Sequence, residues 1–202
     1  MDKQASLPDL TDSVTVPMPT AYGEFAMTVF TDPSDGKEHI YLVMGQPSQV
    51  SEPIIRVHSE CATGDLFASS RCDCGEQLDS SLRIISDAGC GVLIYLRQEG
   101  RGIGLKNKLR AYQLQDHGLD TVDANLQLGL PIDSRSYAIA VAVLKALRIS
   151  KLRLLTNNPE KVISLQAHGL EVNRLPLQAD YHHQNLGYMK TKQIRMGHLV
   201  NL

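Results

Sequence analysis

The sequence predicts a single domain of mixed α/β, or α+β, architecture. Alternating apolar and polar residues near the N-terminus indicate an antiparallel β hairpin. From Cys74 onward, segments with helical spacing alternate with short apolar runs, which is typical of strand-helix alternation. The length of 202 residues suits one domain, because typical domains contain roughly 100–200 residues. We expect a loose N-terminal arm at residues 1–18 and one folded domain over residues 19–202.

The first third of the chain predicts antiparallel β structure. Residues 1–18 combine prolines with polar residues, and this predicts an arm without regular structure. Residues 24–30 and 39–45 predict the two strands of a hairpin, with the sequence DPSDGK as the turn between them. Residues 53–59 predict a third strand of the same antiparallel region.

The remainder of the chain predicts alternating helices and strands. Leu78, Leu82 and Ile85 recur at helical spacing in a segment that ends on Gly89. Asn158 and Pro159 suit the cap and first position of another helix, which should stop at Gly169. The predicted helices cover residues 75–89, 106–117, 137–147 and 158–168, and the predicted strands cover residues 91–97, 151–156 and 171–177.

Charge and hydropathy exclude several classes of partner. The formal net charge is -2, whereas proteins that coat nucleic acid carry a basic excess. No run approaches the roughly 18 apolar residues of a membrane span, and the first residues lack the pattern of a secretory signal. We therefore expect a cytoplasmic protein that binds neither nucleic acid nor membrane. In that compartment the four cysteines indicate metal ligands or buried thiols rather than disulfides.

Three of the cysteines form a cluster with the spacing C-x10-C-x-C. Cys61, Cys72 and Cys74 offer thiolates, which zinc favours, and three protein ligands would leave the fourth position for water. Such an open zinc site lowers the pKa of its water to about 7 and favours hydrolysis. The alternative is a structural site, closed by His58 or by Cys90.

A second pattern indicates anion binding. The stretch RQEGRGIGLKNKLR at residues 97–110 follows a predicted strand, leads into a helix and contains three glycines that let backbone amides approach a phosphate. The alternative is a tight turn before a helix with a solvated basic face. The glycine spacing matches neither a dinucleotide-binding fingerprint nor a Walker A loop. A nicotinamide dehydrogenase is therefore weakly supported.

Two further positions suggest ligand contacts. Thr156 ends a predicted buried strand and Lys161 lies in the first turn of the next helix, where ligands bind in open α/β sheets. Asp133 and Arg135 flank Ser134 in a loop before an apolar helix, although an Asp there is most often only a cap.

Four segments in order resemble the GTP cyclohydrolase II family of riboflavin biosynthesis. They are RVHSECATGDLFASSRCDCGEQL, RQEGRGIGL, NKLRAYQLQDHGLDTVDAN and LLTNNPEKV, and the resemblance runs from about Pro19 to Leu202. The resemblance implies that Cys61, Cys72 and Cys74 hold one Zn²⁺ ion per chain. It also implies that GTP contacts a larger set of residues, namely Arg56, Val57, His58, Ser59, Glu60, Gln77, Glu99, Gly100, Arg101, Thr121, Thr156 and Lys161.

The same resemblance implies three catalytic positions. Tyr112 falls at the family's tyrosine beside the guanine ring, Asp133 matches the proposed proton acceptor, and Arg135 matches the proposed nucleophile toward the α-phosphate. Because a guanidinium stays protonated, an alternative for Arg135 is to neutralise charge at that phosphate while water attacks. His182 and His183, in a loosely matched segment, are interpreted as loop residues rather than ligands.

The implied reaction opens the guanine imidazole ring at C8 and releases formate and pyrophosphate. The product would be a diamino-ribosylamino-pyrimidinone 5′-phosphate, with Mg²⁺ assisting the release of pyrophosphate. The family also implies a homodimer. Two alternatives are a zinc-stabilised nucleotide-binding module without catalysis and a relative that acts on another purine or pyrimidine ring.

Overall fold

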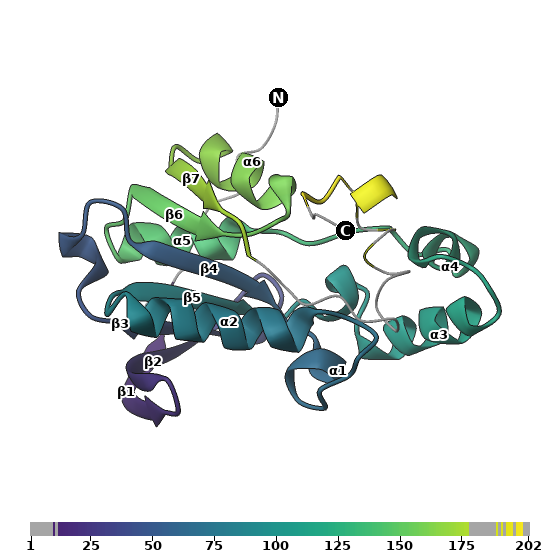
Figure 1. The fold of residues 1–202 in the computed structure, drawn as a ribbon, viewed down its shortest axis with the longest axis horizontal. Helices are drawn as coiled ribbons and strands as arrows, with labels where there is room; N and C mark the ends of the chain where they lie inside the picture. Colours follow the sequence, from purple (N-terminus) through teal and green to yellow (C-terminus); the bar gives the residue numbers. More distant parts are fainter. Residues whose placement is uncertain are drawn as a thin grey trace.

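The structure is a computed structural model that describes Leu10, residues 12–177, Met189, Thr191, residues 193–195 and residues 197–199. One seven-stranded mixed sheet organises these residues, in the order β1-β2-β3-β5-β4-β6-β7 (Figure 1). This arrangement confirms the predicted α+β fold class. The strands are β1 (Ser13–Thr20), β2 (Gly23–Asp32), β3 (Lys37–Met44), β4 (Ile54–Ser59), β5 (Gly91–Leu96), β6 (Lys151–Leu155) and β7 (Glu171–Leu175).

The N-terminal strands form an antiparallel meander. β2 pairs with β3, and this confirms the predicted hairpin with its turn between Asp32 and Lys37. The prediction of a loose arm over residues 1–18 is wrong from Ser13 onward, because β1 pairs with β2 from Ser13 to Thr20. Pro17 is tolerated there because β1 is an edge strand. Most side chains of β1 are exposed, so the strand lacks the usual alternation of buried and exposed residues.

The third predicted strand has a different environment from the one expected. β4 is parallel to both β5 and β6 and lies inside the sheet, so its assignment to an antiparallel region is wrong. The run from Ile54 to His58 is buried throughout, which suits a central parallel strand. The carboxyl ends of these parallel strands therefore meet at one edge of the sheet.

Helices cover both faces of the sheet and create two apolar layers. On one face, α2 (Cys74–Asp87) buries Ile85 against Phe25 and Leu93. On the other face, α5 (Ala138–Ala146) and α6 (Pro159–Ala167) pack on the buried side chains of β4, β5 and β6. These three helices and α3 (Leu105–Asp116) confirm the predicted helices.

The remaining elements lie beyond the carboxyl edge of the parallel strands. They are α1 (Ala62–Asp65), α3, α4 (Thr121–Gln127) and the short 3₁₀ turn η2 (Glu99–Gly102), with a further turn η1 (Pro47–Gln49) elsewhere (Figure 1). The sequence predicted neither α1 nor α4. Within the described part of the chain, no helix has the length and apolar character needed to cross a bilayer. His182 and His183 lie outside the described residues.

Candidate metal centre and anion pocket

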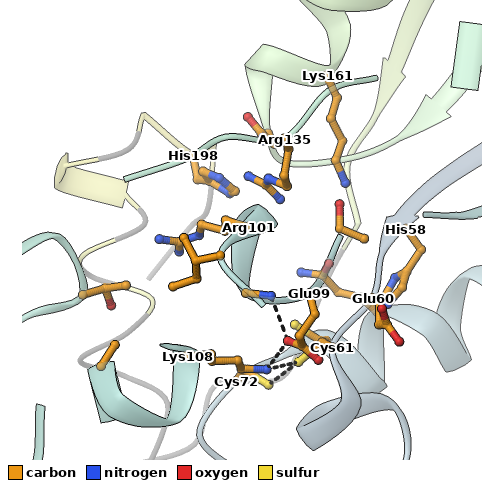
Figure 2. A pocket seen from close by; sticks show the side chains of 18 of the residues that line it. His58, Glu60, Cys61, Cys72, Glu99, Arg101, Lys108, Arg135, Lys161 and His198 are labelled. Carbon is orange, nitrogen blue, oxygen red and sulfur yellow. Dashed lines mark hydrogen bonds and ion pairs between the residues drawn. The ribbon is translucent and has the colours of Figure 1, made fainter. Parts of the chain in front are cut away.

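A pocket opens where β4, β5 and β6 end, and it collects most of the residues singled out in the sequence (Figure 2). Figure 2 shows the thiols of Cys61 and Cys72 at one end, whereas Arg135, Lys161 and His198 lie at the other. The lining includes Arg56, His58, Ser59, Glu60, Cys61, Cys72, Cys74, Gln77, Glu99, Gly100, Arg101, Tyr112, Thr121, Arg135, Thr156 and Lys161. Val57 and Asp133, which were also singled out, are not part of this lining.

The three cysteines converge although ten residues separate the first two. The Sγ atoms of Cys61 and Cys72 lie 3.6 Å apart, and all three sulfurs lie within 4.8 Å of one another. Two glycines allow this approach, because a Cβ on Gly75 would lie 2.4 Å from the carbonyl oxygen of Gly64. A Cβ on Gly64 would in turn lie 3.0 Å from the Cys72 sulfur. The glycine pair thus brings α1 against the start of α2 and sets the spacing of the thiols.

The cluster concentrates negative charge on one sulfur. Hydrogen bonds from the Cys72 and Cys74 thiols lower the pKa of Cys61, and the nearby Lys108 charge acts in the same direction. The same interaction with Cys61 raises the pKa of Cys72 to about 11, and the pKa of Cys74 also rises. Three crowded thiols that compete for one charge form a donor set that a soft divalent cation would stabilise.

Two side chains, His58 and Cys90, were considered as a fourth ligand: His58 is hydrogen-bonded to other residues, and Cys90 lies far from the thiols. His58 Nε2 lies 3.0 Å from Asp65 Oδ1, and its Nδ1 lies 3.3 Å from a guanidinium nitrogen of Arg56. Burial lowers the pKa of His58, so the neutral ring accepts at Nδ1 and donates from Nε2 to the carboxylate. Cys90 precedes β5, about 20 Å of strand away from the end that faces the pocket. Neither side chain closes the three-cysteine site.

Arg56 is a buried cationic side chain that lines the pocket beside this site. Its Nη1 donates to the carbonyl oxygen of Leu155 at 3.0 Å, and its Nη2 donates to Gln77 Oε1 at 2.7 Å. Burial lowers the pKa of Arg56 to about 10, so the group remains charged at neutral pH. Its Nε–H has no hydrogen-bond acceptor among the residues that the structure describes. A bound ligand with acceptor atoms would satisfy this donor.

The glycine-rich stretch forms a strained turn rather than a regular helix start. Gly100 and Arg101 both adopt left-handed φ angles, of 61° and 60°. Such a conformation is uncommon for a residue with a side chain and recurs at binding sites. The Arg101 carbonyl oxygen accepts a hydrogen bond from the backbone N–H of Ser134 at 3.1 Å. This contact fixes the loop that carries Asp133 and Arg135 against the turn.

Asp133 and Arg135 form an ion pair next to the pocket. Arg135 Nε donates to Asp133 Oδ1 at 2.9 Å, and a second guanidinium nitrogen donates to Oδ2. Burial raises the pKa of Asp133, but the hydrogen bonds and charge of Arg135 outweigh it and hold that pKa below its ordinary value. The arrangement presents a guanidinium whose orientation the carboxylate fixes.

Thr156 directly follows β6, Lys161 lies in the first turn of α6, and both residues line the pocket. Lys161 is buried, and its Nζ donates to the carbonyl oxygen of Val57 at 2.7 Å. Lys161 and Arg135 also lie 5.7 and 5.9 Å from the centre of the same ring, that of Tyr137. Val57 therefore contributes a backbone contact that holds Lys161, while its side chain packs in the core.

Several lining residues were not singled out by the sequence. Lys108 lay within the basic stretch but had no separate role, and its Nζ donates to the Cys61 sulfur at 3.1 Å. His198 comes from the far end of the chain, where the N–H of Leu199 donates to the carbonyl oxygen of Asn157 at 2.9 Å. Lys108 belongs to the quoted segment NKLRAYQLQDHGLDTVDAN, but nothing in its spacing from the cysteines gave it a role. The other additions are Ile103, Ala111, Gln115, Asn125, Asn157 and Asn158.

A second group of potential ligands lies away from the pocket, at Asp32, Asp35 and His39. His39 Nδ1 accepts a hydrogen bond from the backbone N–H of Arg97 at 3.1 Å. Burial lowers the pKa of His39, and the proton of the neutral ring therefore sits on Nε2, which lies 3.4 Å from Asp35 Oδ2. A protonated nitrogen offers no lone pair to a metal, so this group stabilises the β2–β3 turn.

The fold and pocket define an α/β protein with a candidate metal centre at one end of a pocket that cationic side chains line at the other. Residues 11–176 match the family described as GTP cyclohydrolase II. The riboflavin biosynthesis protein RibBA of Bacillus cytotoxicus is 53% identical over 194 residues, which cover 96% of this chain and 49% of that protein. RibBA of Chlorobium phaeovibrioides is 51% identical over 185 residues, covering 91% and 45%.

The chain belongs to the GTP cyclohydrolase II family, whose members are hydrolases. It spans about half the length of the curated relatives that it matches. A solved structure of RibBX, a two-domain 3,4-dihydroxy-2-butanone 4-phosphate synthase from A. baumannii, aligns with a TM-score of 0.43 at 18% identity. That alignment covers 76% of this chain and 35% of the other, and it supports no argument about this fold.

Proposed function

We propose that this chain hydrolyses GTP in a zinc-dependent reaction that opens the imidazole ring at C8 and releases formate and pyrophosphate. The observation that carries the proposal is the placement of three thiols and several cationic side chains at opposite ends of one pocket (Figure 2). A nucleotide has the matching polarity, because its base and its triphosphate lie at opposite ends. Membership of the GTP cyclohydrolase II family supports guanine as that base.

The thiol geometry fits zinc. Two thiolates on a tetrahedral zinc, with Zn–S distances near 2.3 Å, lie about 3.8 Å apart. The Cys61 and Cys72 sulfurs lie 3.6 Å apart without any adjustment. Cys61, Cys72 and Cys74 would hold the ion, and when bound it would supply Lewis acidity for the attack of water on C8.

The base end of the pocket suits a planar ring. Tyr112 lines it, with the Arg71 guanidinium 4.7 Å from its ring centre, and we assign its ring to the contact with guanine. Arg56 and Gln77 lie beside the thiols and are already oriented by their mutual hydrogen bond. The Nε–H of Arg56, which meets no acceptor in the described part of the chain, is a further donor available to acceptor atoms of the base.

The phosphate end combines side chains that offset negative charge. We assign Arg101 and Lys161 to the leaving pyrophosphate and Arg135 to the α-phosphate. The ion pair with Asp133 supports an electrostatic role for Arg135, because two guanidinium nitrogens donate to the carboxylate and the group stays charged. A carboxylate with a lowered pKa is a weak base, which favours Asp133 as the group that orients Arg135.

The wider assignments follow from the family and from the names of its relatives. We propose that the reaction is the first step of riboflavin biosynthesis, because the compared relatives are riboflavin biosynthesis proteins. Mg²⁺ would neutralise the triphosphate during release of pyrophosphate. A homodimer in the cytoplasm is the proposed working state.

The decisive experiment incubates the purified, zinc-loaded protein with GTP and measures formate and pyrophosphate. We expect both products from GTP, little of either from ATP, CTP or UTP, and loss of formate in a Cys74→Ser variant. Binding of GTP without formate would identify a nucleotide-binding module and overturn the proposal. Equal turnover of another nucleoside triphosphate would overturn the assignment of guanine.

A further inference from the structure

Lys108 lies beside the candidate metal centre and all of its donors are in use. Its Nζ donates to Cys61 Sγ at 3.1 Å, to Thr63 Oγ1 at 2.9 Å and to Glu99 Oε1 at 2.8 Å. An ammonium group carries three N–H donors, so these three acceptors account for every one of them. The side chain is only 11% exposed, and its stem crosses from α3 to the loop that begins α1. No donor is left over for a substrate phosphate.

Glu99 completes the arrangement from the opposite side. Its Oε2 accepts the backbone N–H of Ala62 at 2.6 Å, and its Oε1 accepts the backbone N–H of Gly100 at 2.8 Å in addition to Lys108. The carboxylate therefore links the strained turn to the residue that follows Cys61. Its contacts within the protein indicate that Glu99 anchors Lys108 and α1 rather than meeting GTP directly.

We propose that Lys108 is a positioning residue of the metal centre: its ammonium group donates to the Cys61 thiolate and sets both the place and the electron donation of that ligand. The inference rests on the proposed function, because it requires the three thiolates to hold a metal ion. Three thiolates and a divalent ion carry a net negative charge, which a buried ammonium group offsets. A hydrogen bond to a ligating sulfur draws electron density from it, so the metal becomes the stronger Lewis acid.

The size of the effect follows from comparable groups in other metal sites. Replacing a residue that orients a metal ligand costs about 10–100-fold in metal affinity or activity. We expect Lys108→Met to weaken metal binding within that range and to lower kcat more than it changes KM. Lys106, which lies on the same helix and is exposed, provides the matched control as Lys106→Met.

Cobalt(II) offers a readout that a purely structural role would not move. Co²⁺ takes the place of zinc in thiolate sites, and its sulfur-to-metal charge-transfer band reports the electron donation of the sulfurs. Loss of the Lys108 hydrogen bond should shift this band to lower energy in Lys108→Met, whereas Lys108→Arg, which retains a charged donor, should return it toward the native position. Lys106→Met should match the native spectrum. If Lys108→Met does not fold, Lys108→Gln carries the same test with a smaller expected shift.

The outcomes separate the inference from the function on which it rests. If the native protein neither binds Co²⁺ through sulfur nor releases formate from GTP, the proposed function fails. If the native protein does both, but Lys108→Met keeps the native band and metal affinity, only the role of Lys108 fails. A raised KM with an unchanged band would show that Lys108 contacts the substrate, and this result would also overturn the inference.

Discussion

The contact between Gly64 and Gly75 makes a quantitative prediction about the metal centre. In a Gly75→Ala variant, the new Cβ would lie 2.4 Å from the Gly64 carbonyl oxygen. Backbone atoms cannot swing aside as the tip of a side chain can, so α1 must retreat by about 1.0–1.6 Å to restore an ordinary contact of 3.4–4 Å. Cys61 immediately precedes α1 and would move with it.

Two opposing terms decide the effect on stability. Alanine is favoured over glycine within a helix by roughly 0.8–1.0 kcal/mol, and Gly75 belongs to α2. Overpacking of a close contact costs typically 1–3 kcal/mol. Because the approach here is to backbone, we expect the upper part of that range and a net loss of about 1–2 kcal/mol.

The effect on metal binding should be the larger one. Metal-ligand distances are tolerated within about 0.2 Å, several times less than the expected displacement of Cys61. We expect zinc affinity to fall at least tenfold, or about 1.4 kcal/mol. Chelator competition measures the affinity, and urea denaturation of the metal-free protein measures the stability.

Gly169→Ala is the matched control for this variant. Gly169 has a left-handed φ of 84° and open space around it, so alanine there should cost about 1–2 kcal/mol through the backbone alone. Its zinc affinity should stay native, because Gly169 does not line the pocket. Native zinc affinity in Gly75→Ala, or an equal loss in both variants, would refute the link between the glycine pair and the thiols.

Three further predictions address the ion pair, the support of the metal loop and the metal itself. Asp133→Asn should lower kcat, because Arg135 loses its orienting partner. Because the pKa of Asp133 is lowered, this carboxylate is charged at every pH above the ordinary pKa of an aspartate. The ion pair with Arg135 is lost only when the pH falls through the lowered pKa. The acid limb of the native pH–rate profile should therefore persist in Asp133→Asn, and its disappearance would contradict this assignment. Tyr95→Phe removes a 2.8 Å hydrogen bond to Asp65 and should cost about 1.5–3 kcal/mol in urea denaturation, whereas a loss below about 0.5 kcal/mol would show that the bond contributes little. Removal of zinc by a chelator should stop formate release while the far-UV circular dichroism stays native, because a chain of 202 residues buries enough surface to fold without a metal, and a lost spectrum would indicate a structural ion.

Elements with a strong local pattern could be predicted from the sequence. The hairpin of β2 and β3 follows from alternation around a turn, and α2 and α6 follow from helical spacing with recognisable ends. β1 could not be predicted because its prolines and exposed side chains imitate a loop. The central place of β4 could not be predicted either, because it also requires pairing with β6, about a hundred residues further along the chain.

In the candidate site, too, some residues could be predicted from a local sequence pattern and others could not. Cys61, Cys72 and Cys74 lie within one short segment, and their spacing alone indicated a metal centre. Lys108 lies within a quoted segment, but only the fold shows that it and His198 reach the pocket. The close contact between two glycines that shapes the centre is likewise a property of the packed chain.

The central claim is that three thiolates hold a zinc ion whose remaining position is open toward a bound guanine. A crystal structure with zinc and a hydrolysis-resistant GTP analogue, phased with anomalous data at the zinc edge, tests it most directly. We expect one anomalous peak about 2.3 Å from the sulfurs of Cys61, Cys72 and Cys74, with guanine C8 facing the open position. A protein side chain in that position, or a guanine bound away from the peak, would contradict it.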